Sequence, residues 1–161
     1  MLHIKAPNPL PSRDSGYRIF LGGSIEMGVA EQWQERLVTA LGGYPDSIVL
    51  ANPRRDDWDS SWEQDPTPGT KFYEQVTWEL ENQETCDLAV YYFDAATKSP
   101  ITLMELGAFG LQDTDATIVC CPPDFWRYGN VAVFCKRYGI LLVHSFDELV
   151  KYVNEIILER L

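Results

Sequence analysis

The chain has 161 residues, of which 45% are hydrophobic and 23% charged, and this composition excludes disordered, collagen-like and coiled-coil proteins. A domain commonly holds about 150 residues, so the length predicts a single domain over residues 1–161. Thirteen basic and 24 acidic side chains give a formal net charge of −11, which disfavours polymeric nucleic acid and anionic membranes as partners.

The first half of the chain predicts strands and helices in alternation. Residues 1–16 are rich in proline and have no apolar periodicity or signal peptide, so we expect an extended segment of a cytoplasmic protein. Apolar runs predict buried strands over Tyr17–Leu21 and Ser47–Ala51. Apolar side chains spaced by four residues predict amphipathic helices over Val29–Leu41 and Phe72–Thr85.

The second half continues this alternation. Ser99 before Pro100 predicts a helix N-cap, and Ser145 with Glu148 predicts a capping box. The remaining strands and helices are expected over Asp87–Phe93, Pro100–Leu111, Ala116–Cys121, Val131–Tyr138, Ile140–Val143 and Phe146–Arg160. No apolar run reaches the roughly 18 residues of a membrane-spanning helix.

This alternation predicts an α/β fold, with a parallel sheet of five strands and helices on both faces. Ligands bind such sheets beyond the carboxyl ends of the strands. The segments of interest are therefore residues 22–27, 52–69, 94–105 and 122–130.

The turn Gly22-Gly23-Ser24 follows the first predicted strand. Without side chains, a ligand can approach backbone N–H groups here, beside a helix N-terminus that favours anions. Glu26 repels a phosphate and therefore favours an uncharged ligand. A tight turn with no ligand explains the two glycines equally well.

The polar stretch Asn52–Asp59 has two interpretations. In the first, it is a solvated charge cluster in which Arg54 pairs with Asp56 or Asp57. In the second, it is a lid whose Trp58 stacks on a heterocyclic base while polar groups recognise the edge of that base.

The sequence contains no metal-site pattern. Its four cysteines include no C-x-x-C pair, and His3 and His144 lie far apart in the chain. Cys120 and Cys121 lie in an apolar run, where cysteine usually serves as a small buried hydrophobe.

Two glutamates are candidates for catalysis. Glu105 lies in an otherwise apolar helix, where a carboxylate is rarely buried unless it is paired. Glu79 is one helical turn from Gln75 and Gln83 and offers a second carboxyl group. Two such groups can divide the work between nucleophile and acid, although a capped or salt-bridged structural glutamate is an equal alternative for Glu105.

The chain resembles the nucleoside 2-deoxyribosyltransferase family in five successive runs, IFLGGSIEMG, NPRRDDWD, QVTWEL, SPITLMELG and FWRYGNV. The resemblance spans Tyr17 to Val143. It implies a small flavodoxin-like or Rossmann-like fold. It also implies an enzyme that moves the deoxyribosyl group of a 2′-deoxynucleoside to a free nucleobase, without a metal ion or organic cofactor.

The same resemblance implies roles for individual residues. Glu105 of the M-E-L-G run corresponds to the nucleophile that forms a covalent deoxyribosyl ester, and Glu79 to the acid that meets the leaving base. Asn130 corresponds to an asparagine that binds the sugar from the neighbouring subunit, which implies a homo-oligomer built from dimers.

Two positions depart from the family pattern. Phe20 stands where related enzymes often have a tyrosine that touches the nucleophile, and Ser99 replaces a sugar-binding aspartate, so Asp94 or Ser99 takes that role. The full substrate-binding set that we expect is Phe20, Gly22, Gly23, Ser24, Asn52, Arg54, Asp57, Trp58, Asp94, Ser99 and Asn130.

Two alternatives to transfer remain open. One is a hydrolase of deoxynucleosides or of their 5′-monophosphates, in which water takes the place of the acceptor base. The other is a nucleoside-binding domain without turnover, since a shared fold does not fix function. For transfer, the site must exclude water, and Trp58, Trp62 and Trp126 are candidates for that cover.

Overall fold

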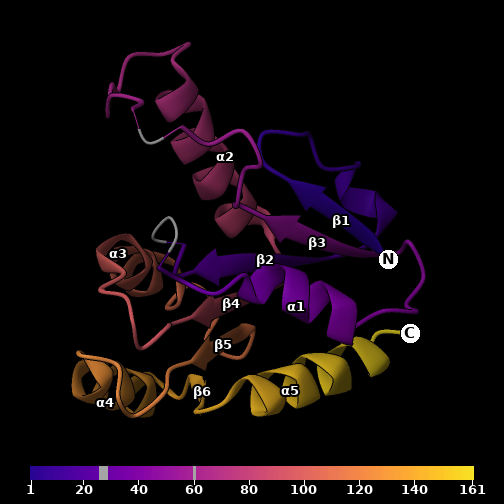
Figure 1. Ribbon diagram of the computed structural model, residues 1–161. Helices are drawn as coiled ribbons and strands as arrows, with labels where there is room; N and C mark the ends of the chain where they lie inside the picture. Colours follow the sequence, from indigo (N-terminus) through magenta and orange to yellow (C-terminus); the bar gives the residue numbers. More distant parts are fainter. Residues whose placement is uncertain (26–28, 60) are drawn as a thin grey trace.

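The computed structural model describes residues 1–25, 29–59 and 61–161, and this part of the chain forms a six-stranded parallel sheet flanked by helices (Figure 1). The strands lie in the spatial order β1-β3-β2-β4-β5-β6, and each neighbouring pair is parallel. Their bounds are β1 Leu2–Lys5, β2 Tyr17–Gly23, β3 Ile48–Asn52, β4 Leu88–Tyr92, β5 Thr117–Cys120 and β6 Leu141–Val143. The predicted α/β class is therefore confirmed.

The sixth strand is the difference from the prediction. Leu2–Lys5 is not merely extended but pairs in parallel with β3, with Leu2 opposite Val49 and Lys5 opposite Asn52. The strand has only four residues and is half-buried throughout, so it is too short for its pattern to be recognised in the sequence.

Five α-helices and one short 3-10 helix accompany the sheet in the described residues. Their bounds are η1 Arg13–Ser15, α1 Trp33–Ala40, α2 Lys71–Thr85, α3 Pro100–Phe109, α4 Tyr128–Tyr138 and α5 Phe146–Leu158. Within these residues, no helix has the length and apolar character needed to cross a bilayer.

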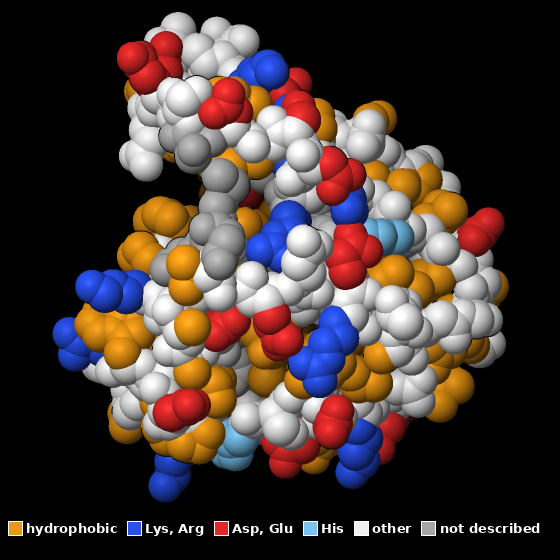
Figure 2. Space-filling model, in the orientation of Figure 1, with side chains coloured by type: hydrophobic (Ala, Val, Ile, Leu, Met, Phe, Trp, Pro, Cys, Tyr) orange, Lys and Arg blue, Asp and Glu red, His pale blue; other side chains and the backbone are white. Residues whose placement is uncertain are grey.

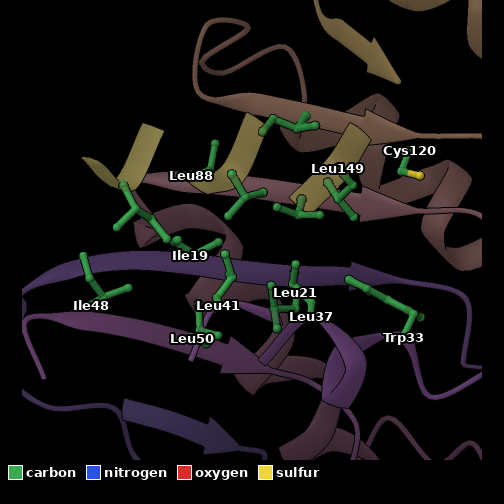
Figure 3. Close-up of a cluster of buried hydrophobic side chains, with 14 of the residues drawn as sticks. Ile19, Leu21, Trp33, Leu37, Leu41, Ile48, Leu50, Leu88, Cys120 and Leu149 are labelled. Carbon is green, nitrogen blue, oxygen red and sulfur yellow. The ribbon is translucent and has the colours of Figure 1, made fainter. Parts of the chain in front are cut away.

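The helices cover both faces of the sheet because successive strand residues point to opposite sides. On one face, Ile19 and Leu21 of β2 pack in a buried cluster with α1 and α5 (Figure 3). On the other face, Phe20 packs with Trp78 of α2, while Tyr91 of β4 belongs to a cluster beneath α3 and α4. Cys120 and Cys121 lie in these clusters, so their predicted role as buried hydrophobes is confirmed.

The starts of α3 and α5 were both predicted from their capping residues, but only α5 has the side-chain hydrogen bonds of a cap. The capping box of α5 is confirmed, since the Ser145 hydroxyl accepts from the backbone of Glu148 and the Glu148 carboxylate accepts from the backbone of Ser145. Ser99 is the N-cap of α3 and Pro100 its first residue, as predicted. With a φ of 47°, however, the Ser99 hydroxyl is bonded to Ser24 and Thr97 and not to the helix backbone. Helix α1 begins at Trp33 and is therefore shorter than predicted.

Candidate active site

The surface is hollowed between α2, together with the loop before it, and α3 (Figure 2). This hollow lies at the carboxyl-terminal end of β2 and β4, where the sequence places the candidate residues. Glu79 comes from α2 and Glu105 from α3, which are the two helices that border the hollow.

Glu105 is a buried carboxyl group without a cation. Its side chain belongs to a residue that is only 7% exposed, and Gln83 Nε2 donates to its Oε1 at 2.8 Å. Among the described residues, none of the ion pairs includes Glu105. Burial raises the pKa of Glu105 to about 7, although the Gln83 hydrogen bond opposes that shift. The salt-bridged alternative for this glutamate is thereby excluded within the described part of the chain.

Glu79 lies one helical turn before Gln83 and has a still higher pKa. Burial raises the pKa of Glu79 to about 8, against a hydrogen bond of 2.7 Å from Gln75 Nε2 and with a further upward contribution from Glu105. The same Gln75 nitrogen also donates to the Pro53 carbonyl oxygen at 2.7 Å. Two carboxyl groups with separated pKa values can be ionised and protonated at the same pH, which suits a nucleophile and an acid.

The sequence did not predict the hydrogen bonds that Gln83, the partner of Glu105, makes with Tyr91 and Glu79. The Tyr91 hydroxyl donates to Gln83 Oε1 at 2.9 Å, and Gln83 Nε2 also lies 3.3 Å from the Glu79 carbonyl oxygen. Spacing along α2 relates Gln83 to Glu79, but no local pattern relates Gln83 to α3 or to β4.

Phe20 and the two glycines pack at the base of the site. A Cβ atom on Gly22 would lie 2.9 Å from the Phe20 ring and 3.1 Å from the Tyr91 ring. A Cβ atom on Gly23 would lie 2.5 Å from the Tyr92 carbonyl oxygen. Both glycines belong to β2 and are required by this packing, which is independent of any ligand.

Ser24 and Ser99 meet in a buried cluster of hydroxyl groups that joins the ends of β2 and β4. Ser24 Oγ lies 2.5 Å from Ser99 Oγ and 2.9 Å from Thr97 Oγ1, and it accepts from the Asp94 backbone at 2.9 Å. The Asp94 carboxylate accepts from the backbone N–H groups of Glu31 and Ala96. Glu26, which we expected to repel phosphate, lies outside the described residues.

Asn52 is fully buried at the end of β3, and its side chain is bonded within the protein. Its Nδ2 lies 2.9 Å from His3 Nε2, and its Oδ1 accepts from the Arg54 backbone at 2.9 Å. The structure therefore brings Asn52 to β1 and not to the two glutamates.

The predicted pairing of Arg54 with Asp56 or Asp57 is wrong. Arg54 extends toward the loop after β2 and donates to the carbonyl oxygens of Ile25 and Glu31. Its neighbour Arg55 pairs with Asp57 at 2.9 Å.

Aromatic side chains cluster on the loop before α2. The rings of Trp58 and Trp62 lie 5.2 Å apart, and the Arg55 guanidinium lies 5.0 Å from the Trp62 ring. Trp58 is 36% exposed, so an aromatic face is available beside the hollow. Trp126 is also exposed, and its Nε1 donates to the Lys98 carbonyl oxygen at 3.0 Å.

Asn130 is exposed on α4, where it borders a groove between α3 and α4. No hydrogen bond joins it to Glu79 or Glu105 within the described residues. The groove is otherwise apolar and is lined by Leu103, Leu106, Gly107, Val131 and Phe134. Met104 and Val133 are exposed on the same two helices, which makes this a candidate contact surface.

In residues 1–25, 29–59 and 61–161, no group of three or more His, Cys, Asp or Glu side chains is placed to hold a metal ion.

The buried Glu105 carboxyl group predicts a pH-dependent gain in stability for Glu105→Gln. The pKa of Glu105 is raised in the fold, so its protonated form stabilises the fold below the unfolded pKa, and this contribution is lost as pH rises through about 7. Glutamine stays neutral, so we expect the variant to melt roughly 5 °C above the wild type at pH 8 and close to it at pH 4.5. Thermal unfolding at both pH values measures this difference, and an equal shift at both would contradict it.

A family model described as nucleoside 2-deoxyribosyltransferase like matches residues 16–125 of the chain. A comparison with curated proteins finds no match. The matched range includes β2 to β5, the loop before α2 and both candidate glutamates, and it ends before α4.

Proposed function

Because the chain belongs to the nucleoside 2-deoxyribosyltransferase-like family, we propose that it cleaves the N-glycosidic bond of a 2′-deoxynucleoside and transfers the deoxyribosyl group to an acceptor nucleobase. The observation that carries this proposal is the pair of carboxyl groups on α2 and α3, of which Glu105 is buried and Glu79 half-buried. Their pKa values of about 8 for Glu79 and about 7 for Glu105 suit an acid and a nucleophile, respectively.

In the first half of the proposed reaction, a Glu105 carboxylate oxygen bonds to C1′ as the bond from C1′ to the base nitrogen breaks. The base leaves with the electron pair of that bond and takes a proton from the Glu79 carboxyl group. Gln83 donates to Oε1 of Glu105, which leaves Oε2 as the attacking oxygen. The negative charge of Glu105 also stabilises the developing oxocarbenium ion of the sugar.

In the second half, an acceptor base enters where the first base left. Its ring nitrogen attacks C1′, the ester bond to Glu105 breaks, and the carboxylate is regenerated. The acceptor loses its N–H proton to the Glu79 carboxylate, so Glu79 returns to its protonated form. No metal ion or organic cofactor is required for either half.

Transfer also requires that water stay away from the ester. Trp58 and Trp62 offer aromatic surface beside the hollow, and the ion pair of Arg55 with Glu74 joins their loop to α2. A base stacked on this surface would cover the ester while it awaits attack.

Base exchange tests the proposed function directly. The protein is incubated with 2′-deoxyinosine and adenine, and the products are separated by chromatography. We expect 2′-deoxyadenosine and hypoxanthine in equal amounts. Free deoxyribose in place of deoxyadenosine would indicate a hydrolase, and nucleoside binding without any product would indicate a binding domain.

We further propose that the enzyme is a dimer or a larger assembly of dimers in which Asn130 reaches the sugar in the partner's site. Its exposed position beside the apolar groove of α3 and α4 supports this arrangement, because such a surface suits a contact between subunits.

Mixed subunits test this arrangement. Glu105→Ala and Asn130→Ala are each expected to be nearly inactive. Random mixing of the two should restore about a quarter of the wild-type activity, because half of the dimers then hold one intact site. Mixing Glu105→Ala with Glu79→Ala is the matched control and should restore nothing, since both glutamates come from one chain. Recovery in the control, or none in the first mixture, would contradict a shared site.

A further inference from the structure

We infer that Tyr91 and Gln83 are positioning residues, which together hold the Glu105 carboxylate in one orientation with Oε2 free. Both act through Glu105, so the inference rests on the function proposed above. It also identifies what takes over the task of the hydroxyl group that Phe20 lacks.

Three elements contribute to this arrangement. Tyr91 of β4 donates its hydroxyl hydrogen to Gln83 Oε1 at 2.9 Å, and Gln83 of α2 donates from Nε2 to Glu105 Oε1 of α3 at 2.8 Å. The three residues are buried, so water does not compete for these hydrogen bonds.

Tyr91 determines which way the Gln83 amide faces. An amide group can present either its oxygen or its nitrogen, and only the nitrogen stabilises a carboxylate. The Tyr91 hydroxyl donates to the oxygen, so the nitrogen is directed to Glu105. The Glu79 carbonyl oxygen lies 3.3 Å from the same nitrogen and favours the same orientation.

The Tyr91 ring is itself held in place. It is fully buried and lies over Gly22, whose missing side chain leaves room for the Tyr91 and Phe20 rings together. Burial raises the pKa of Tyr91 well above its usual range, so the hydroxyl remains a donor at any pH at which the enzyme works.

Among the described residues, two titratable groups interact with Glu105 directly. Glu79 on α2 and Tyr91 on β4 interact with it electrostatically, and Cys86 interacts with Tyr91 in turn. Gln83 lowers the pKa of Glu105 against the larger effect of burial. Loss of the donor should therefore raise this pKa and move the acidic limb of the rate profile to higher pH.

Tyr91→Phe and Gln83→Met test the inference, with Tyr17→Phe as the matched control. The Tyr17 hydroxyl is a donor too, to the Asp87 carbonyl oxygen, but Tyr17 lies at the end of β2 opposite to Gly22. For Tyr91→Phe we expect kcat to fall about tenfold and KM to stay within about twofold, with a larger loss for Gln83→Met. The control should match the wild type.

The pKa of Glu105 is measured separately by NMR titration of protein labelled with ¹³C at the glutamate carboxyl groups. The Glu105 signal is assigned by its loss in Glu105→Gln. We expect Tyr91→Phe to raise the pKa of Glu105 by about one unit. Lower thermal stability without a change in that pKa or in kcat would overturn the inference. This titration needs no turnover, so it decides the matter even if base exchange fails and the proposed function falls.

Discussion

Glu105→Gln is expected to lower kcat/KM for base exchange by at least about 10³-fold, because a neutral amide neither attacks C1′ nor stabilises a sugar cation. The substitution keeps the size of the side chain and the acceptor for Gln83 Nε2, so the fold should be retained. The loss is measured by steady-state rates of deoxyadenosine formation. Glu84→Gln, an exposed position on α2, is the matched control and should retain full activity.

Intact-mass spectrometry separates the role of a nucleophile from that of an electrostatic stabiliser. Wild-type protein quenched in acid during turnover should carry one deoxyribosyl group, and Glu105→Gln should carry none. A peptide map should place the group on the M-E-L-G run. An adduct on another residue, or undiminished exchange by the variant, would refute the assignment of Glu105.

The second large effect is expected at Glu79. Glu79→Gln should lower kcat about 10²-fold for ordinary deoxynucleosides, because the departing base loses its proton donor. A 7-methylated purine deoxynucleoside carries a cationic base that leaves without a proton, so the variant should cleave it at nearly the wild-type rate. Equal losses with both kinds of substrate would show that Glu79 is not the acid.

The rate profile gives the same assignment by another route. Activity needs Glu105 ionised and Glu79 protonated, so the wild-type rate should rise with pH through about 7 and fall through about 8. Because the two carboxyl groups interact, the apparent pKa values of the rising and falling limbs describe the pair and not either residue alone. In Glu79→Gln the falling limb should disappear, whereas the rising limb should remain.

The sequence predicted those features that depend on short stretches of chain. Alternating apolar runs predicted β2 to β6, and a carboxylate inside an apolar helix drew attention to Glu105, which is buried. The four half-buried residues of β1 were missed because prolines follow them and their stabilisation comes from β3.

Contacts between distant segments were not predictable in this way. Arg54 and Arg55 are neighbours with the same sequence surroundings. Only the fold therefore shows that Arg55 and not Arg54 pairs with Asp57. In the same way, Gln83 reaches Glu105 and Tyr91 only because α2, α3 and β4 converge. The sequence showed that Phe20 lacks a hydroxyl group but did not point to Tyr91 of the neighbouring strand, which we propose takes over its task through Gln83.

The strand β1 also has a consequence for solubility. All five residues of β3 are buried, and without β1 the N–H and C=O groups along its edge would be open to pairing with other chains. The edge strand is β1 in place of β3, and it has only four residues. It ends at Lys5, which forms ion pairs with Glu35 and Asp56. Strand β1, which lies before the residues matched by the family model, thus protects the sheet from aggregation. We expect a chain shortened to remove β1 to aggregate through the exposed edge of β3.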